Sequence, residues 1–329
     1  MQILPSRFWQ GYHYVKNSQE TLRPVNLGLS AVADSNPRFM CELVLWALCL
    51  RNTPIKKRFY GVGDFPGGLI ATVEALGVEF RSAQHLISSS PQTTKLYPFL
   101  DEEGYADQIV IDLDLFVVKD ISCFFRRDVI RLPPNNHAVP PLSVFRDIFS
   151  RLGVTEEIEP GVALFHGPDG NRETFASNVS AGAIFVPESL RDFVHLWFEN
   201  AKWLSANREI LGRFSGHIDQ VSFAVAMQRA KVPFLFLPPQ ANAVLHLLPH
   251  ISELYAIHLT PGHIPGFPRL FSRDKTLNLE EVNANIRDAL ARFNETVREA
   301  VGILKTIPET RVFLHNFLNP EWKRQPGGS

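Results

Sequence analysis

The first third of this 329-residue chain alternates strand-like and helix-like segments, and this alternation constrains the fold more than any other feature. Short apolar runs are separated by segments with apolar residues at helical spacing. The expected strands cover residues 25–34, 56–63, 77–83 and 107–113, and the expected helices cover residues 35–52, 69–76 and 93–100. Strands that alternate with helices form a mostly parallel sheet with helices on both faces, so we expect an α/β fold.

The pattern is looser after residue 113. Further strands are expected around residues 129–132, 180–187, 233–238 and 254–259, and further helices at 143–153, 188–204 and 217–230. A long amphipathic helix is expected over 279–305, with one apolar stripe formed by Leu290, Phe293, Val297 and Val301. We therefore expect a main domain over residues 1–270 and a C-terminal helical extension with a disordered tail over 271–329.

Composition excludes several classes of protein. The net charge is −1 and charged residues make up 20% of the chain, so no broad field favours nucleic acid or an anionic membrane surface. Three scattered cysteines are too few for a disulfide framework or a metal knuckle. No secretory leader is evident at the start, and no apolar segment approaches the length of a membrane span. We expect a cytoplasmic protein.

The segment DQIVIDLDLFVVKD, residues 107–120, ends a buried strand with two carboxylates one residue apart. Ligands of parallel sheets bind beyond the carboxyl ends of the strands, where Asp34, Gly63, Asp112 and Asp114 are expected to converge. Paired acids there suit Mg²⁺ or Mn²⁺ shared with a diphosphate. Two alternatives are a phosphatase-type nucleophile and acid, and a turn in which the acids pair with Lys119.

Several segments, in this order, resemble nucleotide-sugar glycosyltransferases of the GT-A fold, most closely the retaining enzymes of family 8. The segments lie within residues 25–265 and read VNLGLSAVADSNPRFMCELVLWALCLRN, TTKLYPFL, IVIDLDLFVVKDI, VSAGAIFVP, HIDQVSFAVAM and AIHLTPG. The resemblance implies a GT-A, Rossmann-like, mostly parallel sheet flanked by helices. It also implies transfer of a sugar from a nucleoside-diphosphate sugar, with a UDP-sugar favoured, to an acceptor hydroxyl that the sequence does not identify.

The same resemblance assigns a metal site. It implies that Asp112 and Asp114 bind Mn²⁺ or Mg²⁺, that Asp112 also reaches the ribose, and that His258 completes the site. Imidazole mildly favours manganese. His263 is the competing third ligand, and a core histidine bonded to backbone is the alternative for His258.

Nucleotide and sugar contacts are implied at further positions. Ala33 and Asp34 would line the base and ribose pocket, although Asp34 with Ser35 could instead cap the following helix. Lys95 would neutralise phosphate, unless it is a solvated helix residue. Gly262 and His263 would approach the diphosphate, unless they form only a turn-rich loop.

Asp219 and Gln220, at the start of a helix, are implied to be the catalytic pair beside the transferred sugar. Ser180 departs from the family, which usually has Asn there, and this leaves the donor sugar open. The loop 135–141 is a candidate acceptor loop or lid. A rival hypothesis is a catalytically silent sugar-nucleotide-binding or scaffolding protein of the same fold, with the C-terminal helix as an interaction or oligomer surface.

Overall fold

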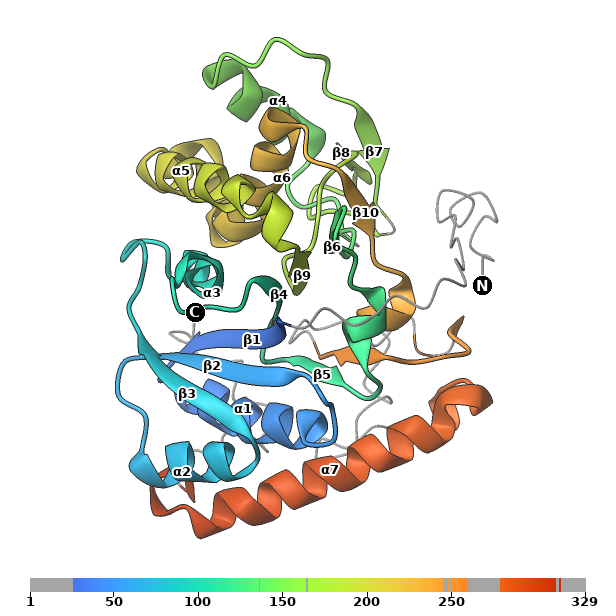
Figure 1. Cartoon of the computed structure of the whole chain (residues 1–329). Coiled ribbons are helices and arrows are strands. Elements are labelled where there is room, and N and C mark those ends of the chain that lie inside the picture. Colours follow the sequence, from blue (N-terminus) through green and yellow to red (C-terminus); the bar gives the residue numbers. More distant parts are fainter. Residues whose placement is uncertain are drawn as a thin grey trace.

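The computed structural model describes residues 26–135, 137–163, 165–244, 248, 250–259, 279–311 and 314 (Figure 1). Its main sheet contains seven strands in the order β10-β6-β9-β4-β1-β2-β3. These strands are β1 (Leu27–Asp34), β2 (Lys56–Val62), β3 (Val78–Ala83), β4 (Asp107–Ile111), β6 (Ile130–Leu132), β9 (Ala183–Val186) and β10 (Phe234–Phe236). Only β9 runs antiparallel to its neighbours, β4 and β6. The predicted α/β fold with a mostly parallel sheet is confirmed.

Two smaller sheets accompany the main one. Strands β11 (Ala243–Val244), β12 (Ala256–His258) and β5 (Leu115–Val117) form a three-stranded sheet, in which β12 is antiparallel to β5. Strands β7 (Pro160–Val162) and β8 (Glu173–Phe175) form a hairpin. The sequence predicted β12 but not the other four, because two or three residues are too few to reveal an alternating pattern.

Helices cover both faces of the main sheet (Figure 1). One face carries α1 (Pro37–Leu50), α2 (Gly67–Ala75) and α7 (Arg287–Thr306), and the other carries α4 (Leu142–Arg151), α5 (Asp192–Ala206) and α6 (Ile218–Ala230). Strand β4 is buried on both sides, because Ile109 and Ile111 join the first core cluster and Val110 joins the second. The first polar positions after β4 therefore lie at the edge of the sheet.

Helix α1 begins where the sequence predicts, but its cap differs. Asn36, not Asp34 or Ser35, is the N-cap, and its side chain accepts a hydrogen bond from the Arg38 N–H. Asp34 instead accepts a hydrogen bond from the Asn36 N–H at 3.0 Å. Pro37 occupies the first turn, where its missing N–H costs nothing.

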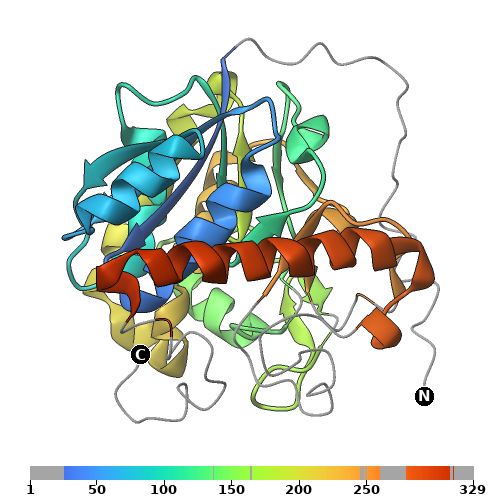
Figure 2. The same ribbon diagram turned by 90° about the horizontal axis from the view of Figure 1, so that it is seen from below.

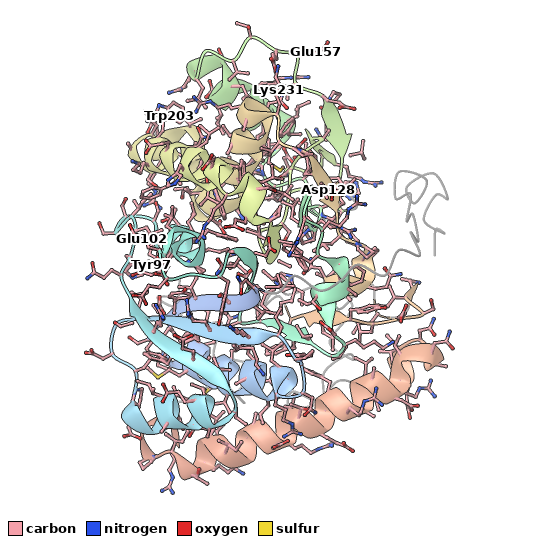
Figure 3. The ribbon with its side chains drawn as sticks, viewed as in Figure 1. Tyr97, Glu102, Asp128, Glu157, Trp203 and Lys231 are labelled. Carbon is pink, nitrogen blue, oxygen red and sulfur yellow. The ribbon has the colours of Figure 1, made fainter. Side chains whose placement is uncertain are left out.

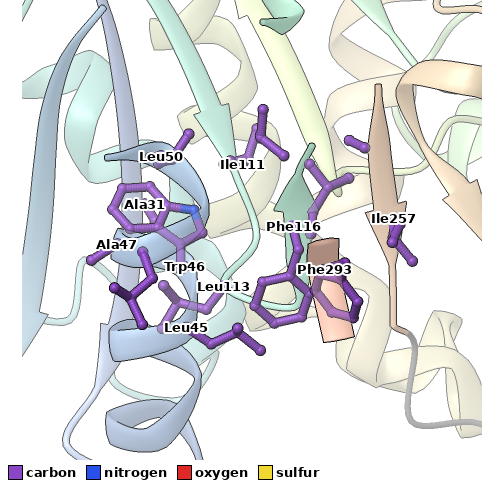
Figure 4. Close-up of a cluster of buried hydrophobic side chains, with 14 of the residues drawn as sticks. Ala31, Leu45, Trp46, Ala47, Leu50, Ile111, Leu113, Phe116, Ile257 and Phe293 are labelled. Atoms are coloured by element: carbon purple, nitrogen blue, oxygen red, sulfur yellow. The ribbon is translucent and has the colours of Figure 1, made fainter. Parts of the chain in front are cut away.

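Helix α7 begins later than predicted. Residues 279–286 form two short 3₁₀ turns, and Asn283 caps the second of them by accepting a hydrogen bond from the Asn285 N–H. Helix α7 lies against α1 (Figure 2), and its buried apolar side chains belong to the first core cluster. The rings of Phe293 and Phe116 lie 5.6 Å apart (Figure 4). The domain division at residue 270 and an oligomer through this helix stay predictions.

Segment 93–100 is helical as predicted, but in two short pieces, a 3₁₀ helix (Pro91–Leu96) followed by α3 (Tyr97–Leu100). On α5, Trp197 is fully buried, and Trp203, labelled in Figure 3, packs partly buried against the second cluster. Among the described residues, no helix combines the length and apolar character needed to cross a bilayer.

Candidate functional site

The turn between β4 and β5 is fixed from three directions. The Asp112 N–H donates to the Gly182 carbonyl at 3.0 Å, and the Leu259 N–H donates to the Asp114 carbonyl at 2.8 Å. Between the two acids, Leu113 is buried in the same cluster as Trp46 and Phe116 (Figure 4). Because Leu113 is held in the core, the flanking carboxylates are presented together at the sheet edge.

His258 reaches this turn from the last described strand. Strand β12 pairs with β5 so that His258 lies opposite Leu115, and its Nε2 is 3.3 Å from Asp114 Oδ1. The other ring nitrogen, Nδ1, is buried and has no hydrogen-bond partner among the residues that the structure describes. The backbone-bonded core histidine is therefore the wrong alternative for this residue.

Lys95 joins two acids that are far apart in the sequence. Its Nζ lies 2.6 Å from Asp112 Oδ1 and 3.3 Å from Asp219 Oδ2, and it donates to the Ala181 carbonyl at 3.0 Å. Only 13% of the Lys95 side chain is exposed, so it is not a solvated helix residue. The other lysine considered, Lys119, pairs with Glu253 instead of the paired acids.

Arg38 is a member of the site that the sequence did not predict. Its Nη2 lies 3.4 Å from Asp114 Oδ2, and its Nε donates to Glu42 Oε1 at 2.7 Å. Arg38 lies in the first turn of α1, where the helix dipole disfavours a positive charge. That unfavourable placement was the one sequence signal that could have indicated a role for this residue.

Asp219 and Gln220 begin helix α6 on the far side of Lys95. The Asp219 carbonyl accepts hydrogen bonds from Trp197 Nε1 at 3.0 Å and from Ser222 Oγ at 2.9 Å, which fixes the start of the helix. Gln220 Nε2 donates to the Val139 carbonyl at 3.2 Å. The structure therefore brings Asp219 to the acid cluster and ties Gln220 to the predicted lid loop.

The remaining predicted residues divide into three groups. The segment from Ser180 to Gly182 borders the cluster with its backbone, because its carbonyls bind Lys95 and Asp112. Ala33 and Asp34 end β1, the strand next to β4, and no described contact joins Asp34 to the paired acids. Gly262 and His263 lie outside the described residues.

Burial disfavours the charged form of each of these groups, and the direction of each pKa shift depends on whether the neighbouring charges outweigh burial. Burial and, to a smaller extent, Asp114 raise the pKa of Asp112, although Lys95 opposes this change. Burial also acts to raise the pKa of Asp114, but His258, Arg38 and Lys95 outweigh it and hold this pKa below its ordinary value. Burial acts to lower the pKa of Lys95 and of His258, and their pairing with carboxylates raises both. Asp114 is therefore held as an anion.

These side chains fit a divalent cation. Asp112, Asp114 and His258 each offer a ligand atom, and these atoms lie within 4.8 Å of one another. Two carboxylates with one imidazole form a donor set that suits a divalent metal cation. His258 Nε2 already faces Asp114 Oδ1 at 3.3 Å, so this ring nitrogen is the one directed at the paired acids.

Comparisons with known proteins identify similar structures but no similar sequences. No family model matches the sequence, and no curated protein matches it. The chain is similar to the galactosyltransferase LgtC in complex with donor and acceptor sugar analogues, with 10% identity, a TM-score of 0.49, and coverage of 83% of this chain and 95% of that one. It is also similar to the glycosyltransferase GlyE of Streptococcus pneumoniae TIGR4, with 12% identity, a TM-score of 0.45, and coverage of 85% and 63%. Structural similarity at this level does not establish a function. The function has to be inferred from the side chains at the edge of the sheet.

Proposed function

We propose that this chain is a metal-dependent glycosyltransferase of the GT-A type, which moves a sugar from a nucleoside-diphosphate sugar to an acceptor hydroxyl. The observation that carries the proposal is the group Asp112, Asp114 and His258, whose ligand atoms lie within 4.8 Å of one another. The two acids follow a buried strand of a mostly parallel sheet, at the edge where such sheets bind ligands, and His258 reaches them from β12. The ordered sequence motifs support the same class of enzyme.

Asp112, Asp114 and His258 would hold Mn²⁺ or Mg²⁺. When bound there, the cation would supply positive charge to the diphosphate that leaves as the sugar bond breaks. Lys95 would act beside it, because its ammonium already bridges Asp112 and Asp219. A lysine in this position keeps the two acids oriented and adds a further positive charge for the phosphates.

The sugar would lie between Lys95 and the start of α6. Asp219 is nearly buried and would accept hydrogen bonds from sugar hydroxyls. The hydrogen bond to the Val139 carbonyl holds the Gln220 amide in one orientation, which suits a role beside the anomeric carbon. Ala33, Asp34 and Ser180 would contribute contacts to the nucleotide and sugar. Retention of anomeric configuration and a UDP-sugar donor complete the proposal.

Thermal unfolding with a panel of nucleoside diphosphates, each with and without Mn²⁺, tests this function. One nucleotide should raise the melting temperature in a metal-dependent way, because ligands that bind only the folded state stabilise it. Slow release of free sugar from the matching nucleotide-sugar should accompany this stabilisation. Asp114→Asn should remove the metal-dependent part, and Asp128→Asn, which changes an exposed acid paired with Arg126, is the matched control.

Two other outcomes would contradict the proposal. Stabilisation by a nucleotide without sugar release, even with lysates as a source of acceptor, would indicate a silent binding protein. Hydrolysis of simple phosphoesters without any nucleotide would indicate a phosphatase. Asp219→Asn separates binding from transfer, because it should leave nucleotide affinity nearly unchanged and lower turnover.

A further inference from the structure

Arg38 contacts an acid that the proposed function gives to the metal. His258 Nε2 is 3.3 Å from Asp114 Oδ1 and Arg38 Nη2 is 3.4 Å from Asp114 Oδ2, so both oxygens of this carboxylate face cationic or potentially cationic groups. A cation that binds Asp114 through both oxygens must share each of them with the group already beside it. At Oδ1, His258 can become a ligand of the same cation, whereas at Oδ2 an arginine has no lone pair to offer. Such a cation therefore competes with Arg38 for Oδ2.

The surroundings of Asp114 are rich in carboxylates. Asp112, Asp114 and Asp219 lie beside Arg38 and Lys95, and Arg38 also pairs with Glu42. A divalent cation would add positive charge to this acidic group. A nucleoside diphosphate that follows the cation brings new negative charge and needs a further cationic partner.

Arg38 is built to be that partner. Its Nε is held by Glu42, one helical turn along α1, at 2.7 Å, while its Nη2 makes the longer contact to Asp114. The contact between Nε and Glu42 fixes the position of the guanidinium, and Nη2 can exchange the Asp114 carboxylate for another acceptor. Guanidinium groups bind phosphate oxygens through two parallel N–H donors. Arg38 also lies in the first turn of a helix, where an anion is favoured.

We propose that Arg38 and a divalent cation compete for Asp114, and that Arg38, once displaced from this carboxylate, binds the diphosphate of the nucleotide. This inference rests on the proposed function and assigns a residue to its diphosphate site. Arg38 then makes the two ligands cooperative, because it opposes the cation when alone and favours the diphosphate that arrives with it.

Binding titrations of Arg38→Met test both halves without measuring turnover. Titration with Mn²⁺ alone should give a dissociation constant about tenfold lower than that of the wild-type protein, because a like charge beside the cation is removed. Titration with UDP and with GDP at saturating Mn²⁺ should give a dissociation constant at least about tenfold higher for the nucleotide that the wild-type protein binds. Arg38→Lys keeps the charge and should leave Mn²⁺ affinity near the wild-type value while weakening the diphosphate.

Arg151→Met is the matched control, because Arg151 also pairs with an acid at helical spacing, Asp147, but on α4. It should change neither titration. Equal or weaker Mn²⁺ binding by a folded Arg38→Met protein, or unchanged diphosphate affinity, would overturn the inference while the proposed function stands. A wild-type protein that binds Mn²⁺ but no nucleoside diphosphate would instead overturn the proposed function together with the diphosphate role of Arg38.

Discussion

Gly182→Ala should damage the metal centre without removing a ligand. A Cβ atom at residue 182 would lie 2.7 Å from Cε1 of His258 and 3.2 Å from its Nδ1, whereas ordinary van der Waals contact begins at 3.4 Å. The imidazole must therefore move by the difference between 2.7 and 3.4 Å, which is 0.7 Å. Metal sites tolerate deviations of only about 0.2 Å in ligand distances.

A shift of the backbone at residue 182 would not relieve the clash harmlessly. The Gly182 carbonyl accepts the Asp112 N–H, and the neighbouring Ala181 carbonyl accepts Lys95 Nζ. Moving this segment therefore displaces Asp112 instead of His258. Either route disturbs one ligand, so we expect Mn²⁺ affinity to fall by about 10- to 100-fold, the size of effect seen when the support of a ligand is removed. Overpacking should also lower the free energy of unfolding by about 1–3 kcal/mol.

The assay is a Mn²⁺ titration of the variant, together with urea unfolding in metal-free buffer. Gly302→Ala is the matched control, because a Cβ there meets nothing within 4 Å and lies in helix α7. It should leave Mn²⁺ affinity unchanged and raise the free energy of unfolding by about 0.5–1 kcal/mol. Wild-type Mn²⁺ affinity in Gly182→Ala would refute the assignment of His258 as a ligand beside a rigid turn.

Further substitutions test the surrounding structure. Lys95→Met should lower the free energy of unfolding by about 3–5 kcal/mol without metal, because it leaves Asp112 and Asp219 without their cation. Urea unfolding at saturating Mn²⁺ should show a smaller loss of free energy, because the bound cation replaces part of the lost positive charge. Equal losses with and without Mn²⁺ would contradict binding of the cation beside these acids. Phe293→Ala should cost about 3–5 kcal/mol in the same assay, because its ring packs on Phe116 in the core. A loss near that of Glu295→Ala, at an exposed position of the same helix, would mean that α7 is not part of this core.

The sequence predicted the main sheet well because its strands have a visible pattern. Ile109, Val110 and Ile111 are all apolar because β4 is buried on both faces, and the acids that follow mark where burial ends. The same logic indicated that these acids face a ligand. It could not indicate the contacts of these acids, because Lys95 meets Asp112 and Asp219 only through the packing of distant elements.

Arg38 and the start of α7 were missed for different physical reasons. The sequence reveals that Arg38 lies in a first helical turn, but the reach of its side chain to Asp114 depends on how α1 packs on the sheet. The apolar stripe of α7 continues in pattern toward residue 279, but Asn283 caps a 3₁₀ turn and so delays the helix to Arg287. Apolar periodicity indicates which residues are buried. It does not reveal where a side chain hydrogen-bonds to the backbone and competes with the helix.

Leu113 lies between two acids and is buried with Trp46 and Phe116. The spacing of the two carboxylates therefore depends on how Leu113 packs against the rings of Trp46 and Phe116. A smaller or larger side chain beside Leu113 would tilt the turn and change the distance between the carboxylates of Asp112 and Asp114. Attempts to stabilise this protein by repacking its interior should therefore leave the layer beneath residue 113 untouched, or accept a change in ion selectivity as the result.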